Sequence, residues 1–186
     1  MYWFKLKQLT IVALICGLFL FIQGSGCKPD IKETGSSLKY FDIKGYFTKE
    51  AARLTKQNKP ILKTITYNGA TESKKVLINN WGRELDFFAS ADINKPAWKD
   101  SYTIEKSGNF LIYKAKYPEL KMREMVIKKD SQKIDWILIY NSTKNLLYQS
   151  TEKLSYFPDS LYIIEKLQRV RLLGTNIYRV KGTIGR

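Results

Sequence analysis

The chain has 186 residues, and its 32 lysines and arginines outnumber 17 aspartates and glutamates, which gives a formal net charge of +15 at pH 7. Such an excess favours anionic partners, for example a membrane surface or acidic glycans. There is no histidine, which excludes histidine general bases, Ser-His-Asp and Cys-His catalysis, and His-ligated zinc or iron. We therefore expect no cofactor, no metal site and no enzymatic activity.

Residues 1–26 are predicted to be a secretory signal. Lys5 and Lys7 form a basic start, an almost wholly apolar run follows over residues 9–22, and small residues precede Cys27. This order of segments is typical of export signals. The apolar run has about fourteen residues, fewer than the roughly 20 that a transmembrane helix needs.

Ser25 and Gly26, directly ahead of Cys27 at the end of the apolar run, resemble the lipobox of bacterial lipoproteins. In that family a diacylglyceryl group is added to the cysteine thiol and the signal is removed. The resemblance implies that Cys27 is the lipidated first residue of the mature chain. Lys28, in place of the Asp that the family associates with inner-membrane retention, implies the outer membrane, on its periplasmic face or at the cell surface. An uncleaved anchor and a cleaved, non-lipidated signal are the alternatives.

Residues 27–39 are polar and aperiodic and are predicted to be a flexible tether, and residues 40–186 a single domain. The domain is predicted to begin with an amphipathic helix of about fifteen residues. Its apolar stripe recurs at helical spacing through Ile43, Phe47 and Leu54, and Pro60 follows its end.

Residues 61–78 are predicted to form a hairpin, because Asn68-Gly69 separates two extended runs. A second helix is expected over residues 81–91, with Asn79-Asn80 supplying its N-cap.

From Tyr102 onward the pattern alternates with period 2, which predicts a series of strands. The expected strands cover residues 102–106, 110–117, 121–129, 133–141, 146–154 and 178–184. Residues 160–173 fit a helix or a strand, and the glycine turn that follows favours a strand. Residues 133–141 are apolar on both faces, which predicts a central strand covered on each side. The fold class is therefore α+β: an antiparallel β-meander of about 6–8 strands packed against two N-terminal helices.

Carboxylate pairs are the remaining route to catalysis or cation binding. Asp92 and Asp100 flank one loop, and Glu124 and Asp135 lie on the two strands of the predicted hairpin of residues 121–141, across which they could meet. A glycosidase needs two carboxylates within about 5–10 Å. Capping turns and ion pairs explain these residues more simply, so we expect no catalytic residue.

Aromatic side chains are abundant in the β half of the chain. Tyrosines and tryptophans that line a concave sheet face bind apolar or glycan ligands, although ordinary sheet packing also accounts for them. The candidate ligand-binding residues are Trp98, Tyr113, Trp136, Tyr140 and Tyr148.

These features predict a lipid-anchored cell-envelope lipoprotein that acts as a binding or interaction module, as a subunit of an outer-membrane complex. The alternative is a carrier or binder of a lipid-like or glycan ligand held in an aromatic-lined concavity of the sheet. The expected partners are the membrane, through the anchor at Cys27, envelope proteins, and anionic lipids or glycans. Nucleic acid is not expected, because the signal directs the chain out of the cytoplasm.

Overall fold

The computed structural model describes residues 38–131 and 133–185, so the predicted signal, Cys27 and most of the predicted tether lie outside the described residues. The chain from Leu38 onward forms one compact unit. Its elements, in chain order, are α2 (Ile43–Gln57), β1 (Ile61–Tyr67), β2 (Ala70–Val76), α3 (Trp81–Glu84), α4 (Asp86–Ala89), η2 (Pro96–Trp98), β3 (Tyr102–Ser107), β4 (Phe110–Ala115), β5 (Met122–Asp130), β6 (Lys133–Lys144), β7 (Tyr148–Phe157), β8 (Leu161–Val170) and β9 (Gly174–Thr183).

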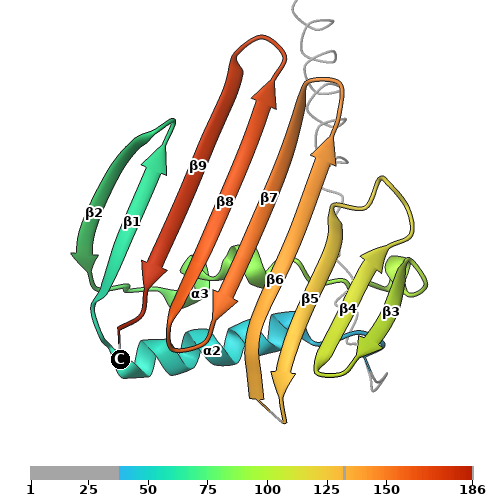
Figure 1. The fold of residues 1–186 in the computed structure, drawn as a ribbon, viewed down its shortest axis with the longest axis horizontal. Coiled ribbons are helices and arrows are strands. Elements are labelled where there is room, and N and C mark those ends of the chain that lie inside the picture. The colour runs from blue at the N-terminus through green and yellow to red at the C-terminus, as the bar shows by residue number, and fades with distance from the viewer. Residues whose placement is uncertain (1–37, 132, 186) are drawn as a thin grey trace, which may run out of the picture. The chain divides into compact units, whose positions relative to one another are not determined.

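The described strands form one antiparallel sheet in the order β2-β1-β9-β8-β7-β6-β5-β4-β3 (Figure 1). The meander runs without interruption from β3 to β9. β9 then returns to lie between β8 and β1, where Thr183 pairs with Leu161 on one side and with Leu62 on the other. The β1–β2 hairpin is thereby joined to the meander, and β2 and β3 form the two edges. This arrangement confirms the predicted α+β class and the antiparallel meander.

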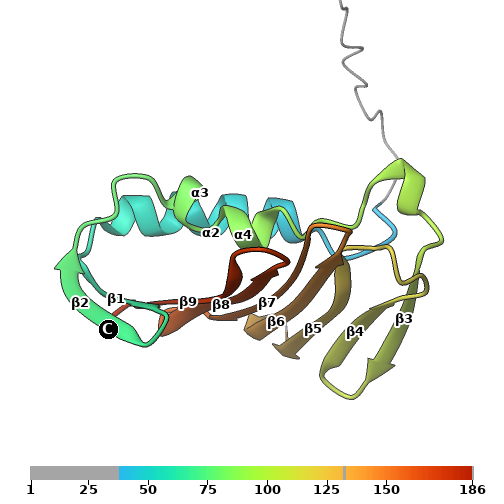
Figure 2. The same ribbon diagram turned by 90° about the horizontal axis from the view of Figure 1, so that it is seen from above.

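The helices α2, α3 and α4 lie on the same side of the sheet (Figure 2). Asp42 caps α2 by accepting a hydrogen bond from the backbone N–H of Gly45 at 2.8 Å. The predicted stripe of α2, including Ile43, Phe47 and Leu54, is buried. It meets the buried side chains of the central strands, so the hydrophobic core lies between the helices and one sheet face. We call the opposite sheet face the open face.

Local turn chemistry accounts for two confirmed predictions. Asn68 and Gly69 have φ of 46° and 93°, as the two-residue turn between β1 and β2 requires. The ambiguous run at residues 160–173 is mainly the strand β8, which ends at a glycine turn where Gly174 has φ of 84°.

The helix predicted over residues 81–91 is two short helices instead, α3 and α4. The backbone of Leu85 leaves the helical region, with φ of −95° and ψ of 7°. Trp81, Leu85 and Phe88 are all buried. These residues stand at positions i, i+4 and i+7, so the apolar stripe expected of the helix is kept although the helix is broken at Leu85.

The prediction that residues 133–141 are covered on both sides is wrong for the described part of the protein. Ile137 and Ile139 of β6 are buried under the helices. Leu138 and Tyr140 alternate with them, point to the open face, and are 36 % and 37 % exposed. No described helix covers that face (Figure 2).

Candidate functional site: the open face and a polar pocket

Two buried tyrosines join the sheet to the helices. Tyr156 of β7 and Tyr162 of β8 are direct cross-strand partners, and each donates a hydrogen bond to a helix carboxylate. Burial, followed by the accepting carboxylate, raises the pKa of both phenols well above the usual value. Both hydroxyls therefore remain protonated, so they serve as hydrogen-bond donors.

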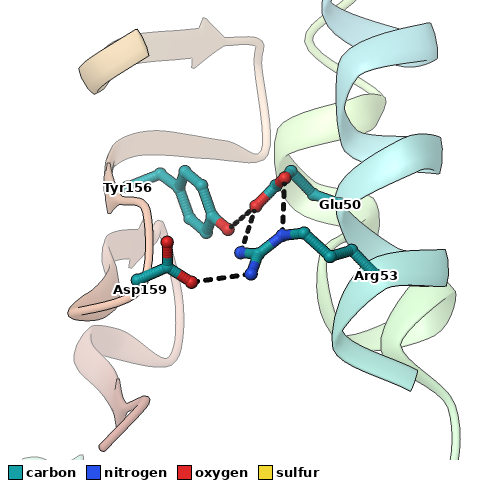
Figure 3. Close-up of polar contacts among 4 residues, drawn as sticks. All are labelled: Glu50, Arg53, Tyr156 and Asp159. Atoms are coloured by element: carbon teal, nitrogen blue, oxygen red, sulfur yellow. Dashed lines mark hydrogen bonds and ion pairs between the residues drawn. The ribbon is translucent and has the colours of Figure 1, made fainter. Parts of the chain in front are cut away.

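Tyr156 donates to Glu50 of α2 at 2.6 Å, as Figure 3 shows. Arg53 holds the same carboxylate through a two-point contact, with its Nε at 3.0 Å and Nη2 at 2.8 Å. Its third nitrogen reaches Asp159 in the β7–β8 turn at 2.6 Å. Each polar group in this cluster has a partner within the cluster, so the cluster attaches α2 to the sheet and offers no free group for chemistry.

Tyr162 makes the corresponding contact with Glu84 of α3, at 2.5 Å. The ammonium of Lys63, on β1, lies 2.7 Å from the same carboxylate. The ring of Tyr162 lies over Gly182 of β9, where an added Cβ would lie only 2.1 Å from a ring carbon. Gly182 is therefore required by close packing.

A pocket of about 340 Å³ opens beside this second cluster. Lys63 and Glu84 contribute charged groups that neutralise each other, and Arg83 is a further cation in its lining. Its apolar lining includes Leu77 and Phe87, which are 48 % and 44 % exposed. The volume is at the lower end of the range for small-molecule sites.

A third polar cluster surrounds Glu152 of β7, which is buried on the helix side of the sheet. Lys121 and Lys166 each lie 3.3 Å from its carboxylate, and Asn141 donates to it at 3.2 Å. Burial opposes ionisation, but the two ammonium groups and the amide outweigh it and hold the pKa of Glu152 below its usual value. A carboxylate in this state acts as an ion-pair partner and not as a proton donor near neutral pH.

On the open face, a row of mainly apolar side chains crosses five strands. Successive cross-strand partners place Ile163 of β8, Ser155 of β7, Leu138 of β6, Val126 of β5 and Ile112 of β4 side by side. Only Ser155 interrupts the row. Side chains at such directly opposed positions touch one another on the sheet surface.

A second apolar row lies beside the first, towards the end of the sheet at which β6 begins. It contains Leu161 and its partner Phe157, followed by Trp136 and Phe110, whose rings have centroids 5.9 Å apart. Lys128 stands between these two rings in the strand register. We call the two rows together the apolar centre.

Charged side chains border the apolar centre. The next row towards the other end of the sheet consists of Arg179, Glu165, Lys153, Tyr140, Glu124 and Lys114. The ion pairs of the open face are Arg179–Glu165 at 3.3 Å, Lys114–Glu105 at 3.6 Å and Lys128–Asp135 at 2.8 Å. An apolar middle with a polar border is the usual anatomy of a protein–protein interface.

The predicted ligand-binding aromatics do not line one surface. Tyr113 and Tyr148 share the helix side of the sheet with Ile139, whereas Trp136 and Tyr140 point to the open face. Tyr113 is also buried, and its hydroxyl accepts a hydrogen bond from the backbone N–H of Phe41 at 2.9 Å. These four residues therefore cannot form a single concave site, because alternate residues of a strand face opposite ways.

The fifth aromatic, Trp98, belongs to the short helix η2 and not to the sheet. Its ring lies 6.5 Å from that of Tyr102, and the ammonium of Lys95 lies 4.2 Å from its centroid. These contacts place Trp98 against Tyr102 at the beginning of β3, as ordinary packing expects.

The carboxylate pairs considered from the sequence are not brought together. Asp92 accepts a hydrogen bond from the backbone N–H of Asn94, whereas Asp100 pairs with Lys39. Glu124 stands opposite Tyr140, and Asp135 pairs with Lys128 as described above. Among the described residues there is no group of three or more Cys, Asp or Glu side chains that could hold a metal ion.

Sequence reasoning missed the residues that join the helices to the sheet. Glu50, Glu84, Tyr156 and Tyr162 lie far apart in the chain, and no local pattern predicts their contacts. The apolar centre, by contrast, had a signal, because both faces of residues 133–141 are apolar; the error was to assume that a second layer covers it.

No family model, curated protein or solved structure matches this chain. Within the part of the chain that the structure describes, no helix is long and apolar enough to cross a membrane.

Proposed function

We propose that the protein is a lipid-anchored lipoprotein of the cell envelope, held at the outer membrane through Cys27, whose domain binds another envelope protein through the open face. The observation that carries this proposal is the apolar centre. Its two rows extend across the sheet from β8 to β4 without cover from any described element. Charged side chains border the rows, and the Lys128–Asp135 ion pair lies within the second row. Exposed contiguous apolar surface of this kind marks interaction sites.

The proposal is tested by asking whether the apolar centre is needed for a complex. We expect the lipidated protein, extracted from envelopes in mild detergent, to migrate as part of a larger assembly. Leu138→Glu should abolish that assembly, because it places a charge in the middle of the interface. Lys153→Glu, in the charged row of the same face, is the matched control and should leave the assembly largely intact.

The same experiment can also contradict the proposed function. A wild-type protein that migrates alone, or a Leu138→Glu variant that still assembles, would contradict the proposal. Leu138 is 36 % exposed and points away from the core, so the variant should unfold at nearly the same denaturant concentration as the wild type. This measurement separates loss of binding from loss of folding.

Lipidation is tested separately by mass spectrometry of the mature chain. The proposal expects an acylated N-terminal Cys27, and Cys27→Ser should remove the added mass. A mature chain that begins elsewhere, or that carries no acyl group, would contradict the anchor.

The pocket beside Glu84 supports the alternative function, a binder of a small ligand. Its apolar lining and its cation at Arg83 suit a ligand with an apolar body and an anionic group. Native and denaturing mass spectrometry of the protein purified from envelopes distinguish the two functions, since a bound ligand adds mass that is lost on denaturation. A bare native mass would favour the interaction module.

A further inference from the structure

Two neighbouring turns at one end of the sheet expose four leucines. Leu146 and Leu147 lie in the β6–β7 turn and are 80 % and 69 % exposed; Leu172 and Leu173 lie in the β8–β9 turn and are 92 % and 81 % exposed. Figure 1 shows both turns at the same end of the sheet. We call these four residues the leucine tip.

The two turns are hydrogen-bonded to each other and within themselves. The backbone N–H of Arg171 donates to the carbonyl of Leu147 at 3.1 Å, and that of Leu173 donates to the carbonyl of Val170 at 3.2 Å. The side chain of Asn145 accepts from the backbone N–H groups of Leu147 and Tyr148, at 2.9 and 2.8 Å. Much of the turn backbone is thus already paired, which lowers the cost of moving the tip out of water.

Three cations lie in or beside the two turns that carry the leucine tip. Lys144, Arg169 and Arg171 are exposed, and none of them has an ion-pair partner among the residues that the structure describes. The sequence holds no Asp or Glu from Lys166 to its last residue. The tip therefore combines four exposed leucines with three cations that have no ion-pair partner among the described residues, and the segments 144–151 and 166–186 that carry it contain no Asp or Glu.

Tyr148 adds a third feature. It follows the β6–β7 turn directly, is 36 % exposed, and pairs in register with Val170 at the beginning of the β8–β9 turn. Tyrosine is enriched at membrane–water interfaces, where its amphipathic ring lies at the level of the headgroups.

From these observations we infer that the leucine tip inserts into the surface of a bilayer that contains anionic lipid. The leucines enter the boundary between headgroups and acyl chains, and the cations contact lipid phosphates, as in other interfacial membrane contacts. The tip lies at one end of the sheet, whereas the apolar centre covers the open face. This inference therefore does not depend on a protein partner for the open face.

The test places an environment-sensitive fluorescent amino acid at position 172 of the full chain by genetic encoding. The protein is reconstituted into vesicles of phosphatidylcholine and phosphatidylglycerol, with or without lipids that carry a nitroxide quencher on the acyl chain. We expect at least a twofold loss of emission at position 172 with quencher present. The same probe at Asn109, in the β3–β4 turn at the opposite end of the sheet, should lose none.

The cations are tested in the same vesicles. Removing Arg171 and Lys144 together, as Arg171→Gln and Lys144→Gln, should reduce the quenching at least twofold, because each cation near an anionic surface strengthens binding several-fold. Lys106→Gln, on β3, is the matched control and should leave it unchanged. For the protein without these substitutions, quenching should also be weaker in vesicles of phosphatidylcholine alone than in vesicles that contain phosphatidylglycerol.

Two results would overturn the inference. One is emission at position 172 that the acyl-chain quencher does not change. The other is a probe that is shielded only when a second protein is added, which would assign the leucine tip to a protein contact instead of a membrane.

Discussion

Tyr156 and Tyr162, on neighbouring strands, each donate a hydrogen bond to a helix carboxylate. These two hydrogen bonds hold the helices against the sheet. Each phenol is buried and donates to a carboxylate that also holds a cation, Arg53 for one and Lys63 for the other. A buried carboxylate without such partners would be costly. The pairs thus allow charged helix residues to face the core side of the sheet.

Tyr156→Phe should destabilise the fold while leaving its shape unchanged. The variant removes the hydrogen bond to Glu50, and bonds to charged groups contribute about 1.5–3 kcal/mol. We expect a loss of that size in the free energy of unfolding, measured by urea titration followed by circular dichroism. Tyr140→Phe, on the open face, is the control and should change it by less than about 0.5 kcal/mol. Equal effects of the two variants would contradict this role of Tyr156.

Glu152 should make stability depend on pH in the acid range. Its pKa is lower in the folded protein than in the unfolded chain, where a glutamate titrates near 4.3. Its contribution is therefore fully present above that value and is lost as pH falls through the folded-state pKa. We expect the difference in unfolding free energy between wild type and Glu152→Gln to shrink below about pH 4. A difference that stays constant from pH 7 to pH 2 would contradict this.

At the scale of elements, the pairing of β8 with β9 includes a close contact in which the ring of Tyr162 lies over Gly182. The cross-strand pair of a large ring and a glycine lets the tyrosine lie flat against the sheet and reach Glu84 on α3. The position of α3 over the sheet thus depends on a residue that has no side chain.

Gly182→Ala should therefore be destabilising although it adds one methyl group. The new Cβ would overlap the ring of Tyr162, and overpacking of this kind typically costs about 1–3 kcal/mol. Thermal unfolding would measure the loss. Gly185→Ala, where a Cβ would meet nothing within 4 Å, should have little effect, and a similar loss in both variants would show that the close approach is unimportant.

At the scale of the whole molecule, the described residues give the sheet one face covered by helices, one open face and two edge strands, β2 and β3. Local patterns were sufficient for the strands and for α2, because periodicity and turn residues such as Asn68-Gly69 act over a few positions. They could not predict that β9 pairs with β1, or that Leu138 faces no second layer. Both depend on contacts between distant segments. The dispersal of the four candidate aromatics that lie on strands has the same cause, since strand parity becomes informative only when the register is known.

Hydrogen exchange should follow the position of each strand in this sheet. Amides of β6, β7 and β8 are paired on both sides, and the core covers one of their faces. Those of the edge strands β2 and β3 should exchange first, because local opening there breaks the fewest contacts. Mass spectrometry of exchanged peptides would measure the order, and uniform protection across the sheet would contradict it.

The place of β9 also bears on the order of events during synthesis. The β1–β2 hairpin and α2 leave the ribosome well before β9, yet β1 obtains its second neighbour only from β9. Pairing between such distant segments is slow, because a long loop must close before the contact forms. Until then β1 and β8 each present an unpaired edge that another chain can join. A chaperone that shields those edges would therefore matter most in the interval between the emergence of β8 and the docking of β9.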